Sequence, residues 1–199
     1  MSVPSVKGIL LSATVAGIQA ALAEGRTSRV QLEVQLDADQ IPCLDEKLDP
    51  TRWYPVTLIG RMAEVLAGIM GGMPDEAQRK LGAAGVAIIR ESGTYPQADF
   101  QPGSLVGASP TEIRAFARVT ASVWPAMYDF GRTRVEWEEQ TGAVVVHYED
   151  VAACPESVRH TIEGFTAEVA RIASDGHAQV TGERPSPDHF LTRIVLGGS

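Results

Sequence analysis

Residues 133–150 read TRVEWEEQTGAVVVHYED, residues 155–174 read PESVRHTIEGFTAEVARIAS, and residues 177–196 read HAQVTGERPSPDHFLTRIVL. In the first of these stretches Val135 and Trp137 alternate with glutamates, which is the two-residue period of a half-buried strand. Gly142 can take the positive φ that a tight hairpin loop needs. The β-branched run after it predicts the return strand of a hairpin.

The middle stretch predicts a helix that is followed by a second hairpin. Pro155 suits the start of a helix, and Gly176 can take the left-handed conformation that ends one. Pro185 and Pro187 lie in the loop that joins the last two strand-like runs. Four strands can then pair antiparallel, with the helix covering one face. The apolar helix face, at spacings of four and three, consists of Val158, Ile162, Phe165, Val169 and Ile172.

Upstream of this region, apolar periodicity predicts three further helices. The first ends at Gly25, the second begins at Pro55 and ends at Gly71, and the third begins at Pro74. Gly82, within the third helix, weakens it but allows close approach of a neighbouring backbone, and Gly85 has the same effects. The residues expected to face inward are Leu11, Val15, Ile18 and Leu22 in the first helix, Val56, Ile59, Met62, Leu66 and Ile69 in the second, and Ala77, Leu81, Ala84 and Ile88 in the third.

The remaining segments carry weaker signals. Residues 29–36 alternate apolar and polar side chains, which predicts a strand. Residues 92–108 are rich in Gly, Pro and Ser and predict a long loop. Ser109 and Glu112 match a capping box, which predicts the start of a helix that Pro125 kinks or ends.

The order of elements gives the fold class. Helices come first and a mixed module follows, which predicts an α+β fold with N-terminal helices packed on a C-terminal antiparallel sheet of hairpin–helix–hairpin arrangement. No repeat, low-complexity tract or linker divides the chain. We therefore expect a single domain over residues 1–199, in which residues 132–196 form the C-terminal module.

Composition and charge limit the classes of partner. The chain is 44% apolar and 21% charged, with a net charge of −8, as in an acidic soluble globular protein. A nucleic-acid backbone or an anionic membrane would need a basic patch, so neither is expected as a partner. No apolar run reaches the length of a membrane span, and the N-terminal apolar stretch lacks the features of a signal peptide. We expect a cytoplasmic protein in which Cys43 and Cys154 are free thiols.

Motifs for catalysis or metal binding are missing from the sequence. The chain has no phosphate-binding loop, no dinucleotide fingerprint and no Gly-x-Ser-x-Gly turn. No pair among the four histidines has zinc-type spacing, although His177 and His189 could approach each other across the last hairpin, beside Cys154 or His160. We predict that the chain is not an enzyme and has no catalytic residues, no metal site and no cofactor. Glu136, Glu138 and Glu139 are expected on a solvated face.

The aromatic residues are the best candidates for a binding site. Tyr and Trp combine an apolar body with a polar atom, which suits half-buried pockets. If the helices pack on the sheet as predicted, several of these side chains would line one cavity; the alternative is that they belong to the core. The predicted ligand-binding residues are Trp53, Tyr54, Trp124, Tyr128, Trp137 and Phe165.

Two family resemblances follow from these patterns. The Trp-Tyr-Pro sequence at residues 53–55, the Ala/Gly-rich helix and the hairpin–helix–hairpin resemble an uncharacterised myxobacterial-type paralogous family of similar chain length, over residues 49–196. Glu163-Gly164-Phe165 and the strand after Asp188 resemble the C-terminal half of the four-vinyl-reductase-type domain. That domain shares a superfamily with haem–nitric-oxide sensor domains and TRAPP-type vesicle-tethering subunits.

The chain also departs from these families. Glu183, Arg184 and Phe190 stand where the four-vinyl-reductase-type domain usually carries cysteines. Residues 111–127, which correspond to the helix that holds the haem iron through a histidine, contain no His. These departures argue against a haem or a cysteine-bound metal.

The resemblance implies small-molecule binding or protein interaction, often as a homodimer. We therefore expect a non-enzymatic bacterial sensory or regulatory module that binds a small apolar or aromatic ligand. The alternative is a protein-interaction adaptor in a bacterial signalling or polarity pathway, with a signalling protein as partner and no small-molecule ligand. Fold-level analogy alone does not separate the two.

Overall fold

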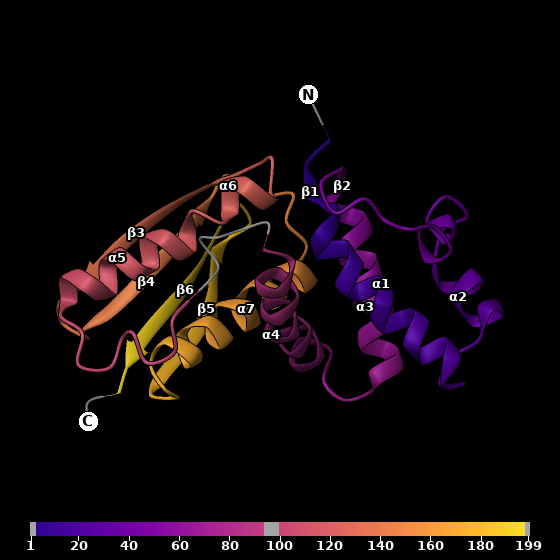
Figure 1. Cartoon of the computed structure of the whole chain (residues 1–199). Coiled ribbons are helices and arrows are strands. Elements are labelled where there is room, and N and C mark those ends of the chain that lie inside the picture. The colour runs from indigo at the N-terminus through magenta and orange to yellow at the C-terminus, as the bar shows by residue number, and fades with distance from the viewer. Residues whose placement is uncertain (1–2, 94–99, 198–199) are drawn as a thin grey trace.

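The computed structural model describes residues 3–93 and 100–197. Its elements fall into a helical N-terminal part and a mixed C-terminal part (Figure 1). The N-terminal part contains β1 (Ser5–Lys7), α1 (Gly8–Ala23), α2 (Arg29–Gln35), the 3-10 helix η1 (Ile41–Leu44), β2 (Trp53–Pro55), α3 (Val56–Met70) and α4 (Pro74–Ser92). The C-terminal part contains α5 (Pro110–Ala121), α6 (Trp124–Met127), β3 (Arg132–Glu138), β4 (Ala143–Glu149), α7 (Glu156–Ala173), β5 (Ala178–Ser186) and β6 (His189–Leu196).

The C-terminal sheet has the strand order β3-β4-β6-β5, with every neighbouring pair antiparallel. Gly142 turns the first hairpin at φ +65°, as the sequence predicts. The Thr133 hydroxyl on β3 donates to the Ala121 carbonyl of α5, and the residue opposite it, Tyr148, faces Thr166 of α7. Both helices therefore cover the same face of the sheet. The α+β prediction, with helices against a hairpin–helix–hairpin sheet, is confirmed.

Helix α4 connects the two parts of the molecule. It lies between α7 and the pair formed by α1 and α3, as Figure 1 shows. One buried apolar core runs from Ile18 on α1, through Met62 on α3 and Val86 on α4, to Val169 on α7. The order of layers across the molecule is therefore the sheet, α7, α4 and the α1–α3 pair.

Residues 53–55 form a strand before the helix begins, because β2 pairs antiparallel with β1 at the N-terminus. Pro55 is the residue preceding the first turn of α3, at φ −54° and ψ 134°. An isolated bridge joins Val6 of β1 to Tyr128. This small sheet ties the N-terminus to the segment that follows α6.

The prediction of a strand at residues 29–36 is wrong, because residues 29–35 form α2. Ser28 caps this helix, and it exchanges hydrogen bonds with Gln31 in a full capping box. Leu32 is buried, whereas Val30 and Val34 point to solvent. Alternation over so short a stretch also satisfies the three- and four-residue spacings of a helix, and the cap decides between the two.

The predicted inward face of α4 is partly wrong. Ala84 is exposed and Ile88 is 37% exposed, whereas Val86 and Ile89 are buried. Gly82 lies against the backbone of α7, and the buried stripe of α4 runs through Gly82, Val86 and Ile89. Of the four predicted inward residues, Ala77 is buried and Leu81 is half-buried.

Helix α5 begins as the capping box predicts, with hydrogen bonds between Ser109 and the backbone and side chain of Glu112. It ends at Ala121, and the short α6 follows with Pro125 in its first turn. The predicted loop at residues 92–108 lies partly outside the described residues. Its described C-terminal part supplies a hydrogen bond to the C-terminal end of α7, since the Leu105 amide donates to the Ala173 carbonyl at 2.7 Å.

Within the described ranges, no single helix combines the length and the apolar character that crossing a bilayer requires. Helices α3 and α4 meet these criteria only when taken together, as a pair bent by 110°.

Candidate functional site

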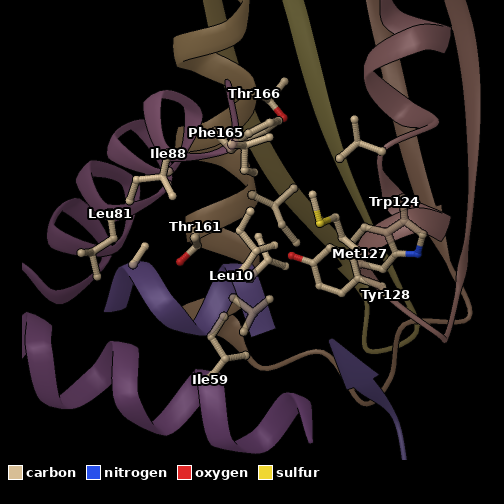
Figure 2. A pocket seen from close by; sticks show the side chains of 18 of the residues that line it. Leu10, Ile59, Leu81, Ile88, Trp124, Met127, Tyr128, Thr161, Phe165 and Thr166 are labelled. Atoms are coloured by element: carbon tan, nitrogen blue, oxygen red, sulfur yellow. The ribbon is translucent and has the colours of Figure 1, made fainter. Parts of the chain in front are cut away.

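A cavity lies where the N-terminal helices meet the C-terminal part, and Figure 2 shows its walls. Helices α1, α3 and α4 form one side, and α5, α6, β4 and α7 form the other. Its volume is about 80 Å³. Apart from hydroxyl groups, the side chains that line it are aliphatic, aromatic or sulfur-containing, and none of the described lining residues carries a charge or an imidazole.

The spacing of α4 and α7 explains why the cavity exists. A Cβ atom on Gly82 would lie 1.9 Å from the Thr161 carbonyl oxygen, and one on Gly164 would lie 2.0 Å from the Arg79 carbonyl oxygen. The two helices therefore touch backbone to backbone at this level. One turn further along α4, a Cβ atom on Gly85 would meet nothing within 4 Å. Gly85 lines the cavity, so α4 borders open space at this level instead of meeting a neighbouring backbone.

An aromatic cluster forms the wall of the cavity at α6. The Trp124 and Tyr128 rings stack with centroids 3.9 Å apart and planes 11° apart, and the Tyr148 ring meets Trp124 edge-on at 5.0 Å. Trp124 Nε1 donates a hydrogen bond to the Phe130 carbonyl at 2.8 Å. Stacked and edge-on rings of this kind hold one another in place, so this wall is rigid.

Hydroxyl groups supply the polar atoms of the cavity. Thr161 Oγ1 donates to the Ser157 carbonyl at 2.9 Å, and Thr120 Oγ1 donates to the Phe116 carbonyl at 3.1 Å, so both hydroxyls are used within their own helices. No hydrogen bond from the described residues reaches the hydroxyl of Tyr128. Burial raises the pKa of Tyr128 well above its ordinary value, so the phenol stays protonated.

Tyr148 is the second buried phenol at the cavity. Burial raises its pKa as well, and the hydroxyls of Thr166 and Thr192 partly offset that shift. The Tyr148 ring also stacks on Phe190 at 4.4 Å. Its phenol thus faces protein hydroxyls, whereas that of Tyr128 faces the cavity.

The structure brings together three of the six residues that the sequence proposes for ligand binding. Trp124, Tyr128 and Phe165 line the cavity. Trp53 and Trp137 lie elsewhere: Trp53 is 40% exposed on β2 with the Lys7 ammonium 4.0 Å from the centre of its ring, and Trp137 is half-buried on β3 opposite Val144.

Tyr54, the sixth of these residues, packs beside Gly8 and is half-buried. The three tryptophans therefore do not surround one void, because Trp53 and Trp137 are not among the described residues that line the cavity. The aromatic composition predicted that aromatic side chains would line a cavity. Which of those side chains line it depends on which strands and helices pack together.

Other lining residues carry no sequence signal of their own. Leu10 and Thr14 of α1, and Leu81 and Ile88 of α4, belong to ordinary helical patterns. The useful signal was the glycine pair of α4, since Gly82 makes the close approach that the sequence predicts. Gly85, for which the same role was expected, opens onto the cavity instead.

The histidines lie outside the cavity. His147 and His189 bond to each other on the outer face of the sheet, with Nδ1 and Nε2 3.1 Å apart. His160 lies beside Glu163, with Nδ1 3.4 Å from Oε2. In the described part of the chain, no group of three or more His, Cys, Asp or Glu residues is placed to hold a metal ion.

Both cysteines are free thiols, as the sequence predicts. Cys154 is buried, and burial raises its pKa to about 12, so its thiol is protonated and unreactive at neutral pH. Burial also raises the pKa of the half-buried Cys43, with Glu46 and Asp39 adding to the effect.

Comparison with known proteins places this fold. No family model matches the chain, and no curated protein matches it. Solved structures of H-NOX proteins do match it over nearly their whole length. The Fe(II) unliganded H-NOX protein from K. algicida is 12% identical, with 97% of each chain covered and a TM-score of 0.62. The S. oneidensis H-NOX protein in its Fe(II)NO state is 11% identical, with 96% of this chain and 99% of that chain covered and a TM-score of 0.59.

A third match is a mutant of the T. Tengcongensis H-NOX protein, 11% identical, with 96% of this chain and 98% of that chain covered and a TM-score of 0.53. At these identities the likeness shows a common fold. It agrees with the distant resemblance to haem–nitric-oxide sensor domains that the sequence indicates.

The residues of this cavity do not fit a haem. A haem iron is held by a His, Cys or Tyr side chain, or by Met together with His. His and Cys are missing from the described lining, so Met127 has no histidine there to act with. Tyr128 would have to bind as phenolate, which its burial disfavours. No Lys or Arg among the described lining residues could neutralise the propionates, and about 80 Å³ is far below the ~300 Å³ at which cofactor pockets begin.

Proposed function

We propose that this chain is a sensory or regulatory module that binds a small apolar ligand in the cavity between α4, α7 and the aromatic wall. The observation that carries the proposal is an apolar cavity placed at the junction of the helical part and the sheet part. A ligand there contacts both parts at once, so its binding can change how the helices sit on the sheet.

The lining supports binding rather than catalysis, and we propose that the chain is not an enzyme. Among the described lining residues the titratable groups are the phenols of Tyr128 and Tyr148, and burial raises the pKa of each. Neither phenol has a described imidazole or carboxylate beside it in the cavity to act as general base. We also propose that the chain is related to the myxobacterial-type and four-vinyl-reductase-type families. We further propose that it acts in the cytoplasm as a homodimer.

Filling the cavity tests this function. In Gly85→Leu the new side chain would extend into the open space beside α4. This substitution should abolish the binding of xenon, an apolar probe. The NMR shifts of cavity methyl groups measure xenon binding. Gly68→Leu is the matched control. Gly68 is also a helix glycine whose Cβ atom would meet nothing within 4 Å, but it lies on α3 away from the cavity.

Both substitutions remove a helix glycine and should leave the fold at least as stable. Xenon binding by the wild type and by Gly68→Leu, with none by Gly85→Leu, supports the proposal. Equal responses in all three proteins, or no response in the wild type, would contradict it.

The alternative function is an adaptor that binds a signalling protein and no small ligand. The exposed apolar pair Val30 and Val34 on α2, 69% and 82% exposed, is the observation that favours it. Val34→Asp should then weaken partner capture, or self-association measured by light scattering, while xenon binding stays unchanged.

A further inference from the structure

We propose that the cavity selects small uncharged molecules that carry a hydrogen-bond acceptor, and that the Tyr128 hydroxyl is the group that recognises it. This inference rests on the proposed ligand-binding function and names the chemical class of the ligand. It follows from three observations: the Tyr128 hydroxyl has no hydrogen-bond partner among the described residues, packing fixes the position of the Tyr128 ring, and the cavity is small and its described lining uncharged.

Tyr128 is only 9% exposed, and none of the described residues forms a hydrogen bond with its hydroxyl, which stays accessible from the cavity that Tyr128 lines. A polar atom that faces an apolar cavity gains free energy when a partner forms a hydrogen bond with it, because the apolar lining supplies none. Figure 2 shows the hydroxyl turned into the cavity, toward the side formed by Leu10 and Thr161. A ligand that offers an acceptor there would supply the missing bond.

The ring cannot swing away to find a partner elsewhere. It stacks on Trp124 at 3.9 Å, and Phe130 meets it at 90° with centroids 5.8 Å apart. The Tyr128 amide donates to the Trp124 carbonyl at 2.8 Å, and its backbone bridges to Val6 of β1. The direction of the hydroxyl is therefore fixed before any ligand arrives, which lowers the entropy cost of binding.

The charge of the cavity excludes ions. No described lining residue is acidic or basic, so a charged ligand would lose its hydration without gaining a counter-charge. Because burial keeps the Tyr128 phenol protonated, it can donate to a ketone, aldehyde or ether oxygen. Thr14 of α1 is the other lining residue whose hydroxyl has no described partner, but its short side chain lies on the opposite wall.

The size of the cavity limits the ligand further. At about 80 Å³ it has roughly half the volume of the ~150 Å³ cavity that accepts benzene in an engineered protein. Scaled from benzene, which has six non-hydrogen atoms, molecules of about three to four non-hydrogen atoms are of the right size. Ile88, which is 37% exposed, marks an edge where the lining of the cavity reaches the surface.

The test compares two probes of the same shape, acetone and 2-methylpropene, which differ by a carbonyl oxygen in place of a methylene group. Dissociation constants come from NMR titrations of the full chain, in the wild type, in Tyr128→Phe and in Thr161→Val. The Thr161 hydroxyl already bonds to its own helix, so Thr161→Val removes a cavity hydroxyl that the proposal does not use.

We expect Tyr128→Phe to weaken ketone binding about tenfold relative to the alkene, since a lost hydrogen bond changes affinity by that order. Thr161→Val should leave the ratio of the two constants unchanged. A ratio that stays the same in Tyr128→Phe, with both probes bound, would overturn the role of Tyr128 and leave the binding function standing. A wild type that binds neither probe overturns the proposed function and this inference together.

Discussion

The contact between α4 and α7 has a closed end and an open end. At the closed end Gly82 and Gly164 bring the two backbones together, and the Arg79 side chain reaches the buried Glu163 carboxylate at 3.1 Å. At the open end Gly85 faces an empty space walled by aromatic rings. Two glycines three positions apart on one helix thus serve different purposes, and only the neighbouring helix distinguishes them.

The largest effect should come from adding a methyl group at the closed end. Gly82→Ala puts a Cβ atom 1.9 Å from the Thr161 carbonyl oxygen, so the helices must separate. Overpacking of this kind costs about 3 kcal/mol of unfolding free energy. Urea unfolding followed by circular dichroism measures the loss, and Gly164→Ala should behave alike.

Gly85→Ala is the matched control at the open end. The same change there meets no atom within 4 Å and improves helix propensity, so it should stabilise the protein by up to about 1 kcal/mol. If Gly82→Ala and Gly85→Ala had equal effects, the distinction between the two ends would be wrong.

A smaller effect should follow from removing the charge of Glu163. This carboxylate is 9% exposed and lies within ion-pair distance of Arg79 and Arg159, and it accepts a hydrogen bond from the Gly182 amide at 3.2 Å. Glu163→Gln leaves both guanidinium groups without their shared partner. Because Arg79 is partly solvated, the expected loss is about 2 kcal/mol in urea unfolding.

Glu168→Gln provides the comparison, since Glu168 pairs with a more exposed arginine, Arg171. An exposed pair contributes little, so the expected change is within about 0.5 kcal/mol. Equal losses for the two substitutions would mean that Glu163 does not hold the closed end together.

The smallest effect concerns pH at the closed end. Burial lowers the pKa of His160 below its ordinary 6.5, with Arg159 and Arg79 adding to the shift and Glu163 opposing it. Below pH 6.5 the unfolded chain binds a proton that the folded protein resists. The unfolding free energy should therefore fall as the pH drops through that window, and stay constant above it.

Unfolding at about pH 7.5 and at about pH 5.5 measures this dependence. His160→Gln should make it shallower without abolishing it, because burial lowers the pKa of His147 in the same direction. A dependence that is unchanged in His160→Gln would show that this imidazole titrates freely in the folded protein.

Much of the fold could be predicted from local patterns. The turn at Gly142, the capping box at Ser109 and the break before Pro125 each depend on residues within a few positions of one another. Sequence reasoning failed at residues 29–35, where two periodicities fit one short stretch. The extent of the domain, set at residues 1–199, stays a prediction.

The sequence predicted the chemical character of the candidate site but only some of the residues that line it. Aromatic residues indicated a half-buried apolar wall, and three of the six named side chains lie on it. Trp53, Tyr54 and Trp137 have the same chemistry, but they lie on β2 and β3, none of whose described residues lines the cavity. Proximity between residues far apart in the chain is a property of packing, which composition does not encode.

The sequence by itself determined the class of fold, the acidic net charge and the lack of zinc-type or catalytic motifs, because each depends on composition or on short-range spacing. Only the tertiary structure decided that Gly82 closes the contact between α4 and α7 while Gly85 opens it. It also left the Tyr128 hydroxyl unpaired in an apolar cavity. The physical reason is that contact, burial and hydrogen bonding depend on the neighbours a residue acquires when distant helices and strands pack together.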